Sequence, residues 1–182
     1  YGVRYTQEDE AIDIPARLAE LAAYLKEETE RLGLPMPRFL MEPGRSIVAD
    51  AGMTLYTVGS VKRIPGYKQY AAVDGGMTDN PRYALYQSRY TVYHAHKSGS
   101  LERFDVVGRC CESGDIIQPD VELPGDTCRG DILAVCTTGA YNYSMASNYN
   151  RLPRPAVVML TPDRIYEAVR RETFADLTGL DL

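Results

Sequence analysis

The chain has 182 residues, of which 45% are hydrophobic and 25% are charged, and its formal net charge is −5. This length supports one hydrophobic core and a smaller additional unit. A mildly acidic chain without clustered Lys and Arg is not expected to bind nucleic acid. No apolar run approaches the roughly 20 residues of a membrane span, and no signal peptide opens the sequence. We therefore expect a cytoplasmic protein with no nucleic-acid or membrane partner.

The cysteine and histidine content does not indicate a metal site. The four cysteines form no C-x-x-C pair, which favours reduced cytosolic thiols over a disulfide framework or a zinc site. His94 and His96 would share one face of a strand, but the pattern contains no third ligand. We expect these histidines to pack at the surface or in the core, and we expect no bound metal.

The first predicted element is an amphipathic helix that begins after Asp13. Asp13 is a good N-cap, Pro15 is tolerated in the first turn, and Gly33 is a typical C-terminal stop. The short apolar run 38–41 then predicts a buried strand that ends at Glu42. A helix, a tight loop and a buried strand are typical of an α/β unit. The buried face of the helix is predicted from the i, i+3, i+4, i+7 spacing of Leu18, Leu21, Ala22, Leu25 and Leu32.

Beyond about residue 51 the sequence changes to short runs of Val, Ile, Tyr and Thr separated by Gly and Pro pairs. Several short strands without long intervening helices predict an antiparallel β-barrel or sandwich. A final helix is expected from Pro162 or Asp163, through Ile165 and Val169, into Arg171. The predicted strands are 54–64, 70–73, 89–94, 105–109, 131–137 and 156–160.

These elements predict a mainly β protein with two parts. Residues 1–52 form a remnant of an α/β domain, and residues 53–182 form a complete β domain. A lone helix–strand unit cannot close a sheet, so its partners are expected upstream. The first residue is Tyr1 rather than Met, which fits the expectation that the chain is part of a longer enzyme.

Two short motifs carry candidate chemistry at the ends of predicted strands. In Glu42-Pro43-Gly44-Arg45, a carboxylate and a guanidinium at the mouth of a buried strand cost energy unless they meet ligands or each other. This motif is equally compatible with a strand-end ion pair. In 111–115, Cys111 and Glu112 belong to a polar cluster that follows a β-prone run, where loops often carry function. An acidic surface turn is the alternative.

A second pair of motifs carries an arginine and tyrosines. Pro81 can open a helical turn that places Arg82 and Tyr86 at i, i+4 on one face, where a guanidinium beside a phenol suits a carboxylate. Arg82 could equally cover Tyr86 on a solvated face. Tyr141 follows the small residues Gly139 and Ala140 and could offer its hydroxyl to a phosphate or simply pack.

Together these motifs occur in an order and spacing that resemble the C-terminal half of diaminopimelate decarboxylases. This family belongs to the fold-type III decarboxylases that use pyridoxal 5′-phosphate. The resemblance covers essentially the whole chain and rests on Glu42 to Arg45, Asp74-Gly75-Gly76, Arg82 with Tyr86, Cys111 to Asp115, and Gly139-Ala140-Tyr141. The opening residues 1–5 also look like the tail of the family's glycine-rich phosphate-binding loop.

The resemblance implies an N-terminal (β/α)8 barrel, a C-terminal β domain and a head-to-tail homodimer. Residues 38–42 would be the last barrel strand, and the lysine that forms the Schiff base with the cofactor would lie outside this chain. Glu42 would pair with the pyridine nitrogen, where a carboxylate keeps that nitrogen protonated. Tyr141 would hydrogen-bond the cofactor phosphate and would also bind the substrate. Arg45 would meet the substrate or the phosphate.

The resemblance also implies a substrate, meso-2,6-diaminopimelate, and a product, L-lysine. The distal end of this substrate bears an ammonium and a carboxylate, which Glu112 and the pair Arg82 with Tyr86 could bind. A lone ammonium, as in ornithine, would be repelled by Arg82. Cys111 would protonate the carbon that has lost carbon dioxide, and its loop would complete the partner subunit's site.

Two alternatives remain open. One is a related pyridoxal-dependent decarboxylase that acts on ornithine or arginine. The other is a stand-alone β module that binds a partner and performs no chemistry. In either of the enzyme readings the 182 residues alone are expected to be inactive, and the helix 13–32 is expected to expose its apolar face.

Overall fold

The computed structural model describes residues 2–182. Helix α1 spans Ile14–Leu32, and its N-cap Asp13 accepts a hydrogen bond from the backbone N–H of Ala16 at 2.9 Å. Gly33 ends the helix in the left-handed conformation with φ of 65°, a region that glycine enters without steric cost. The predicted helix and both of its end signals are therefore confirmed.

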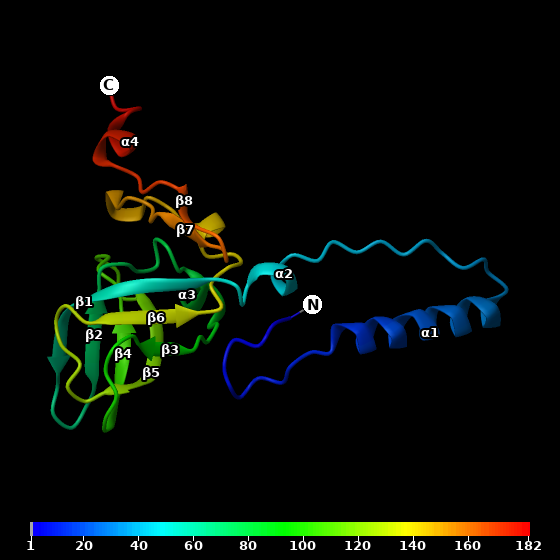
Figure 1. The fold of residues 1–182 in the computed structure, drawn as a ribbon, viewed down its shortest axis with the longest axis horizontal. Helices are drawn as coiled ribbons and strands as arrows, with labels where there is room; N and C mark the ends of the chain where they lie inside the picture. Colours follow the sequence, from blue (N-terminus) through cyan, green and yellow to red (C-terminus); the bar gives the residue numbers. More distant parts are fainter. Residues whose placement is uncertain (1) are drawn as a thin grey trace.

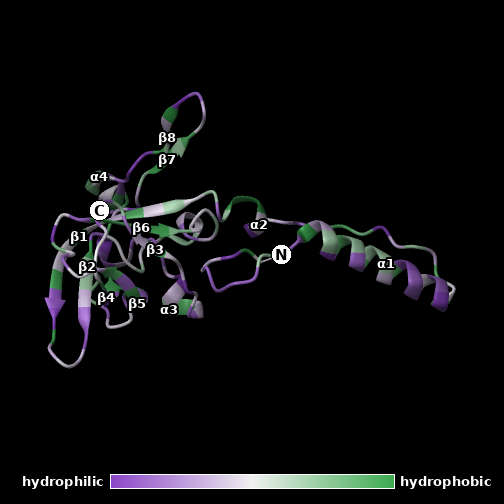
Figure 2. Ribbon diagram, turned by 60° about the horizontal axis from the view of Figure 1, so that its bottom comes forward, coloured by the Kyte–Doolittle hydropathy of each residue, from purple (hydrophilic) through white to green (hydrophobic). Residues whose placement is uncertain are grey.

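Helix α1 extends away from the rest of the molecule in both ribbon views (Figures 1 and 2). None of its residues is buried, and its apolar face is exposed, with Leu18 36% and Leu32 55% accessible. A helix of this length gains most of its stability in proteins from packing an amphipathic face. The expectation that α1 exposes its apolar face is therefore confirmed.

The predicted strand at residues 38–41 is wrong for the described chain. This segment has no regular secondary structure, and Phe39 and Leu40 are 52% and 73% exposed. A strand needs a hydrogen-bonded neighbour, and no described strand pairs with this run. The segment leads through the short helix α2, Arg45–Val48, into the β domain.

The β domain is a six-stranded sheet with the strand order β3-β6-β1-β2-β4-β5. Neighbouring strands are antiparallel except for β2 and β4, which run parallel. The edge strands β3 and β5 contact each other, so the sheet curls into a nearly closed barrel (Figure 1). The strands span Met53–Arg63 (β1), Gln69–Val73 (β2), Val92–His94 (β3), Leu101–Val107 (β4), Ile116–Pro124 (β5) and Ile132–Cys136 (β6).

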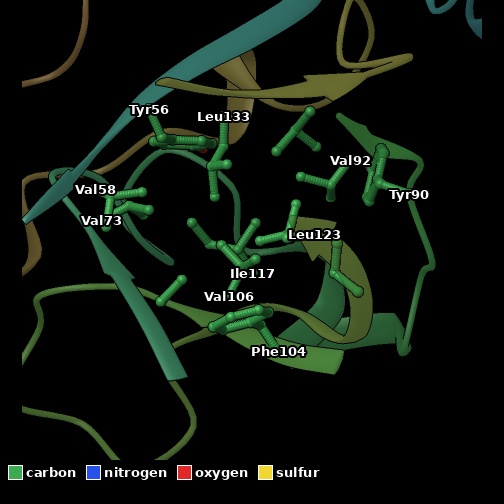
Figure 3. Close-up of a cluster of buried hydrophobic side chains, with 13 residues drawn as sticks. Tyr56, Val58, Val73, Tyr90, Val92, Phe104, Val106, Ile117, Leu123 and Leu133 are labelled. Atoms are coloured by element: carbon green, nitrogen blue, oxygen red, sulfur yellow. The ribbon is translucent and has the colours of Figure 1, made fainter. Parts of the chain in front are cut away.

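The core lies inside this barrel and follows the alternation of each strand (Figure 3). Tyr56 and Val58 point inward from β1, and Leu133 and Val135 point inward from β6, because successive side chains face opposite sides of a sheet. Phe104 in β4 is 1% exposed and lies at the base of the view in Figure 3. The mainly β fold class predicted from the sequence is confirmed.

Strand β5 was not predicted, since Pro119 and Asp120 interrupt its run of apolar residues. Asp120 adopts φ of 53°, and the pairing of β4 with β5 shifts register beside it, as expected for a bulge. The backbone N–H of Asp120 donates to the carboxylate of Asp105 at 3.0 Å. A side chain of the neighbouring strand thus supports the irregular residue.

The final helix predicted from Pro162 or Asp163 is also wrong. Ile165–Val169 forms strand β8, which pairs antiparallel with β7, Val157–Leu160, across the turn at Pro162 and Asp163. The spacing of Ile165 and Val169 fits a helix, but their β-branched side chains favour the hairpin. The remaining short elements are α3 (Arg82–Tyr86), α4 (Phe174–Thr178) and the 3-10 turns Tyr143–Met145 and Tyr149–Arg151.

Candidate active site

Arg82 is the first residue of helix α3, and its N-cap is Pro81, as the sequence predicted. Its guanidinium lies 5.2 Å from the ring centre of Tyr86, one turn later on the same face. Arg82 is only 7% exposed, whereas Tyr86 is 60% exposed. The side chain of Arg82 is therefore buried beneath Tyr86 rather than spread over a solvated surface.

Tyr141 joins this pair from the loop that follows β6. The guanidinium of Arg82 lies 5.3 Å from the Tyr141 ring centre, and that of Arg45 lies 5.4 Å from it. We call Arg45, Tyr141, Arg82 and Tyr86 the Arg–Tyr stack. It brings together four of the predicted site residues from three separate segments of the chain.

Two glycines bring the loop after β6 close to the segment that carries Arg45. A Cβ on Gly139 would lie 1.9 Å from the carbonyl oxygen of Val48 in α2, so only glycine fits there. A Cβ on Gly44 would lie 3.9 Å from the Tyr141 hydroxyl. Tyr141 itself has φ of 67°, which turns the chain sharply at the stack.

Both arginines of the stack lack a carboxylate partner within residues 2–182. The one hydrogen bond from Arg82 goes to the hydroxyl of Ser88 at 3.4 Å, and Nε of Arg82 and of Arg45 is buried without an acceptor among the described residues. A desolvated guanidinium is costly without an anion. The site therefore fits an anionic ligand.

The stack is backed by buried polar groups that the sequence did not single out. Asn80, Tyr90 and Asn142 are at most 3% exposed, and their polar side-chain atoms have no partner within the described chain. Burial raises the pKa of Tyr90 to about 12, although the nearby Arg82 opposes the shift. Tyr90 is consequently neutral at physiological pH and cannot balance the charge of Arg82.

The sequence contained a signal for two of these three buried polar residues. Asn80 precedes Pro81 and Asn142 follows Tyr141, so both adjoin predicted site residues. Tyr90 had no such signal, because its position beside the Arg–Tyr stack depends on how β3 packs. The ring of Tyr5 also contacts Tyr90 edge-on at 5.1 Å, which ties the N-terminal segment to this region.

Cys111 and Glu112 lie on the loop between β4 and β5, and both are exposed. The Glu112 carboxylate accepts hydrogen bonds from the backbone N–H of Gly114 at 3.2 Å and from the Ser113 hydroxyl at 3.4 Å. Neither Cys111 nor Glu112 forms a hydrogen bond or ion pair with the Arg–Tyr stack. The described chain thus contains two separate groups of predicted site residues.

Of the two adjacent thiols, only Cys111 is freely accessible. Cys110 is partly buried, and burial, reinforced by the charge of Asp115, raises the pKa of its thiol to about 11. Cys110 therefore keeps its proton near pH 7, but its partial burial limits access to a substrate, which leaves the exposed Cys111 as the candidate for proton transfer on this loop.

Glu42 lies in the irregular segment before α2 and is exposed. It forms no hydrogen bond or ion pair with Arg45 or any other described side chain, so the alternative of a strand-end ion pair finds no support in residues 2–182. The carboxylate is free to meet a group from outside the chain.

His94 forms hydrogen bonds within the turn that follows β3. Nδ1 of His94 accepts from the backbone N–H groups of His96 and Lys97 at 3.2 and 2.9 Å, and Nε2 lies 3.1 Å from the Asp131 carboxylate. His94 thereby stabilises the turn after β3. Among residues 2–182, no cluster of three or more His, Cys, Asp or Glu side chains is arranged to hold a metal ion.

The nearly closed sheet and the unpaired arginines beside it define a β domain whose Arg–Tyr stack fits an anionic ligand. The chain belongs to the pyridoxal-dependent decarboxylases: the family model for their C-terminal sheet domain matches residues 12–139. No described helix has both the length and the apolar composition needed to cross a membrane.

Similar proteins carry more specific names. The diaminopimelate decarboxylase of Bacillus subtilis (strain 168) is 48% identical over 184 residues, covering 100% of this chain. The crystal structure of the diaminopimelate decarboxylase of M. jannaschii in complex with L-lysine superposes with a TM-score of 0.89 at 32% identity, also over 100% of this chain. A lysine/ornithine decarboxylase from Vibrio vulnificus complexed with cadaverine gives 0.67 at 27% identity over 83% of it.

This chain covers a minor part of each relative. It spans 42% of the Bacillus subtilis protein, 41% of the M. jannaschii chain and 39% of the Vibrio vulnificus chain.

Proposed function

We propose that this chain is the C-terminal part of a pyridoxal 5′-phosphate-dependent decarboxylase that converts meso-2,6-diaminopimelate to L-lysine and carbon dioxide. The relatives from Bacillus subtilis and M. jannaschii, which cover the whole chain, carry the name diaminopimelate decarboxylase. Residues 1–52 would belong to the cofactor-binding barrel and residues 53–182 to the β domain. The enzyme would act in the cytoplasm as a homodimer.

One observation carries the substrate class: Arg82 is buried and has no carboxylate partner in residues 2–182. A cation in this environment binds an anion strongly, because the cost of its desolvation has already been met in the folded protein. The distal carboxylate of diaminopimelate supplies that anion. Lysine and ornithine end in an ammonium alone, which Arg82 would repel.

The residues present fit the cofactor as well. Arg45 and the Tyr141 hydroxyl can donate to a phosphate, and Gly44 leaves room beside that hydroxyl. The Glu42 carboxylate, which has no partner in the described chain, would hold a proton at the pyridine nitrogen. When bound, pyridoxal phosphate supplies an electron-accepting ring that stabilises the charge left as carbon dioxide departs. Arg45 could instead contact the substrate.

Cys111 and Glu112 would serve the site of the partner subunit. Both are exposed and form no hydrogen bond or ion pair with the Arg–Tyr stack of their own chain, as expected for groups donated across an interface. Glu112 would bind the distal ammonium of the substrate. The thiol of Cys111 would deliver a proton to the carbon that has lost carbon dioxide.

The test is carbon dioxide release by the full-length protein with pyridoxal phosphate. Meso-diaminopimelate should be the preferred substrate over L-ornithine, L-arginine and L-lysine. Preference for ornithine or arginine would instead support the related decarboxylase, for which the likeness to the Vibrio vulnificus enzyme is the motivating observation. Absence of decarboxylation and of cofactor binding would favour the non-catalytic β module.

A further inference from the structure

We propose that Asp115 is a positioning residue that clamps the Cys111–Glu112 loop to the segment leading into helix α3. Asp115 is 4% exposed, although it follows the exposed residues 111–113. One carboxylate oxygen accepts from the backbone N–H of Met77 at 2.6 Å, and the other accepts from the backbone N–H of Cys110 at 2.7 Å. The side chain thus joins two loops that follow different strands.

The surroundings of this carboxylate are shaped for it. A Cβ on Gly108 would lie 2.2 Å from one Asp115 oxygen, and a Cβ on Gly76 would lie 2.7 Å from both. Glycines at these two positions let both loops approach the carboxylate closely enough for their N–H groups to reach it. Charge-assisted hydrogen bonds to backbone N–H groups are stronger than neutral ones, which suits a fixed clamp.

The clamp links the two groups of predicted site residues within one chain. A backbone hydrogen bond from Arg109 to Gly75, at 3.1 Å, holds the same two loops together. The segment 74–80 then leads directly into Pro81 and Arg82. Its Asp79 carboxylate accepts from the Tyr56 hydroxyl, so this segment is also anchored to the barrel core. Asp115 therefore fixes Cys111 and Glu112 relative to the element that carries Arg82.

This inference deepens the proposed function and rests on it only for the role of Cys111 and Glu112. Asp115→Asn keeps the size of the side chain but places an amide N–H2 against a backbone N–H, which removes one acceptor. The matched control is Asp105→Asn. Asp105 is a carboxylate that is 5% exposed and likewise accepts a backbone N–H, but it lies in β4 away from this loop.

Both variants are made in the full-length protein and compared by hydrogen–deuterium exchange and by kinetics. In Asp115→Asn we expect amide exchange in peptides covering Met77 and Cys110 to rise at least tenfold, with no such rise in Asp105→Asn. We also expect kcat with diaminopimelate to fall 10- to 100-fold, because Cys111 is displaced, and KM to rise at least threefold, because Glu112 lies on the same loop. Asp105→Asn should keep kcat within threefold even if it lowers Tm equally.

The clamp is refuted if exchange in both peptides is the same in Asp115→Asn as in the wild type, or if Asp105→Asn reproduces both effects. Failure of the proposed function would be recognised by the activity of the wild-type protein rather than by exchange in the variant. If the wild-type protein does not act on diaminopimelate, but Asp115→Asn alone raises exchange at Met77 and Cys110, the clamp stands and the assigned reaction falls.

Discussion

Replacing Arg82 by Met tests the anion site most directly. The change removes two contacts of the guanidinium with the rings of Tyr86 and Tyr141, at 5.2 and 5.3 Å, each worth about 0.5–2 kcal/mol. It also removes a buried cation without a counter-ion, whose desolvation costs several kcal/mol. Met is of similar length and fills irregular space. We therefore expect the free energy of unfolding to stay the same or to rise by about 1 kcal/mol.

The same replacement should weaken the reaction with diaminopimelate, although it does not lower the stability of the fold. Loss of the guanidinium leaves the distal carboxylate of diaminopimelate unpaired, at a cost of about 3–5 kcal/mol. At about 1.4 kcal/mol per tenfold change, kcat/KM should fall about 10²- to 4 × 10³-fold. L-Lysine lacks the distal carboxylate, so its low kcat/KM should stay constant or rise. The ratio of the two values isolates the contribution of Arg82.

The assay is carbon dioxide release by the full-length variant on both substrates, with urea unfolding measured in parallel. Arg63→Met is the matched control, because Arg63 lies 5.4 Å from the Phe104 ring centre but at a distant part of the barrel. It should leave kcat/KM for diaminopimelate within threefold. An equal loss on diaminopimelate and L-lysine in Arg82→Met, or a clear loss of stability, would refute the anion site.

Three further changes probe the domain. Gly139→Ala places a Cβ against a backbone carbonyl of α2, so it should lower the free energy of unfolding in urea by about 3 kcal/mol. In the control Gly59→Ala, the Cβ would lie 3.6 Å from its nearest neighbour, so the free energy of unfolding should change little. Phe104→Ala should cost about 3–5 kcal/mol in the same assay. The ion pair with Arg154 lowers the pKa of Glu172 from 4.5 to about 2, so its stabilisation is present above pH 4.5 and lost as the pH falls toward 2. In that window, hydrogen–deuterium exchange in peptides covering the β7–β8 hairpin, corrected for the intrinsic pH dependence of exchange, should increase, and Glu172→Gln should show the increase already at pH 7.

Each of these expectations has a contrary result. A cost below about 1 kcal/mol for Gly139→Ala would mean that α2 can move away from the loop after β6. A similarly small cost for Phe104→Ala would mean that the barrel collapses around the lost ring. Corrected exchange in the hairpin that is independent of pH in the wild type would show that Glu172 does not secure it.

Local sequence signals determined a definite part of this protein. Asp13, Pro15 and Gly33 predicted the bounds of α1, because end signals act through the nearest backbone groups. Alternating Val, Ile and Tyr predicted most strands of the barrel. The motifs around Arg82 and Tyr141 were found in the sequence because each is a contiguous run.

Other features depended on contacts between distant segments. Strand β5 contains Pro119 and a bulge, and it is formed because β4 supplies its hydrogen bonds. Ile165–Val169 became a strand because β7 lies beside it, and 38–41 remained irregular because no described strand does. A strand obtains its hydrogen bonds from another segment, so its own residues cannot determine it alone.

In the candidate active site, too, some features followed from the sequence and others only from tertiary contacts. The sequence identified Arg45, Arg82 and Tyr141 as candidates, but their assembly into one stack required the fold to bring three segments together. The burial of Arg82 without a counter-ion, and the clamp formed by Asp115, are likewise properties of tertiary packing. Charge and hydrogen-bonding capacity belong to a residue, whereas desolvation and pairing depend on what surrounds it.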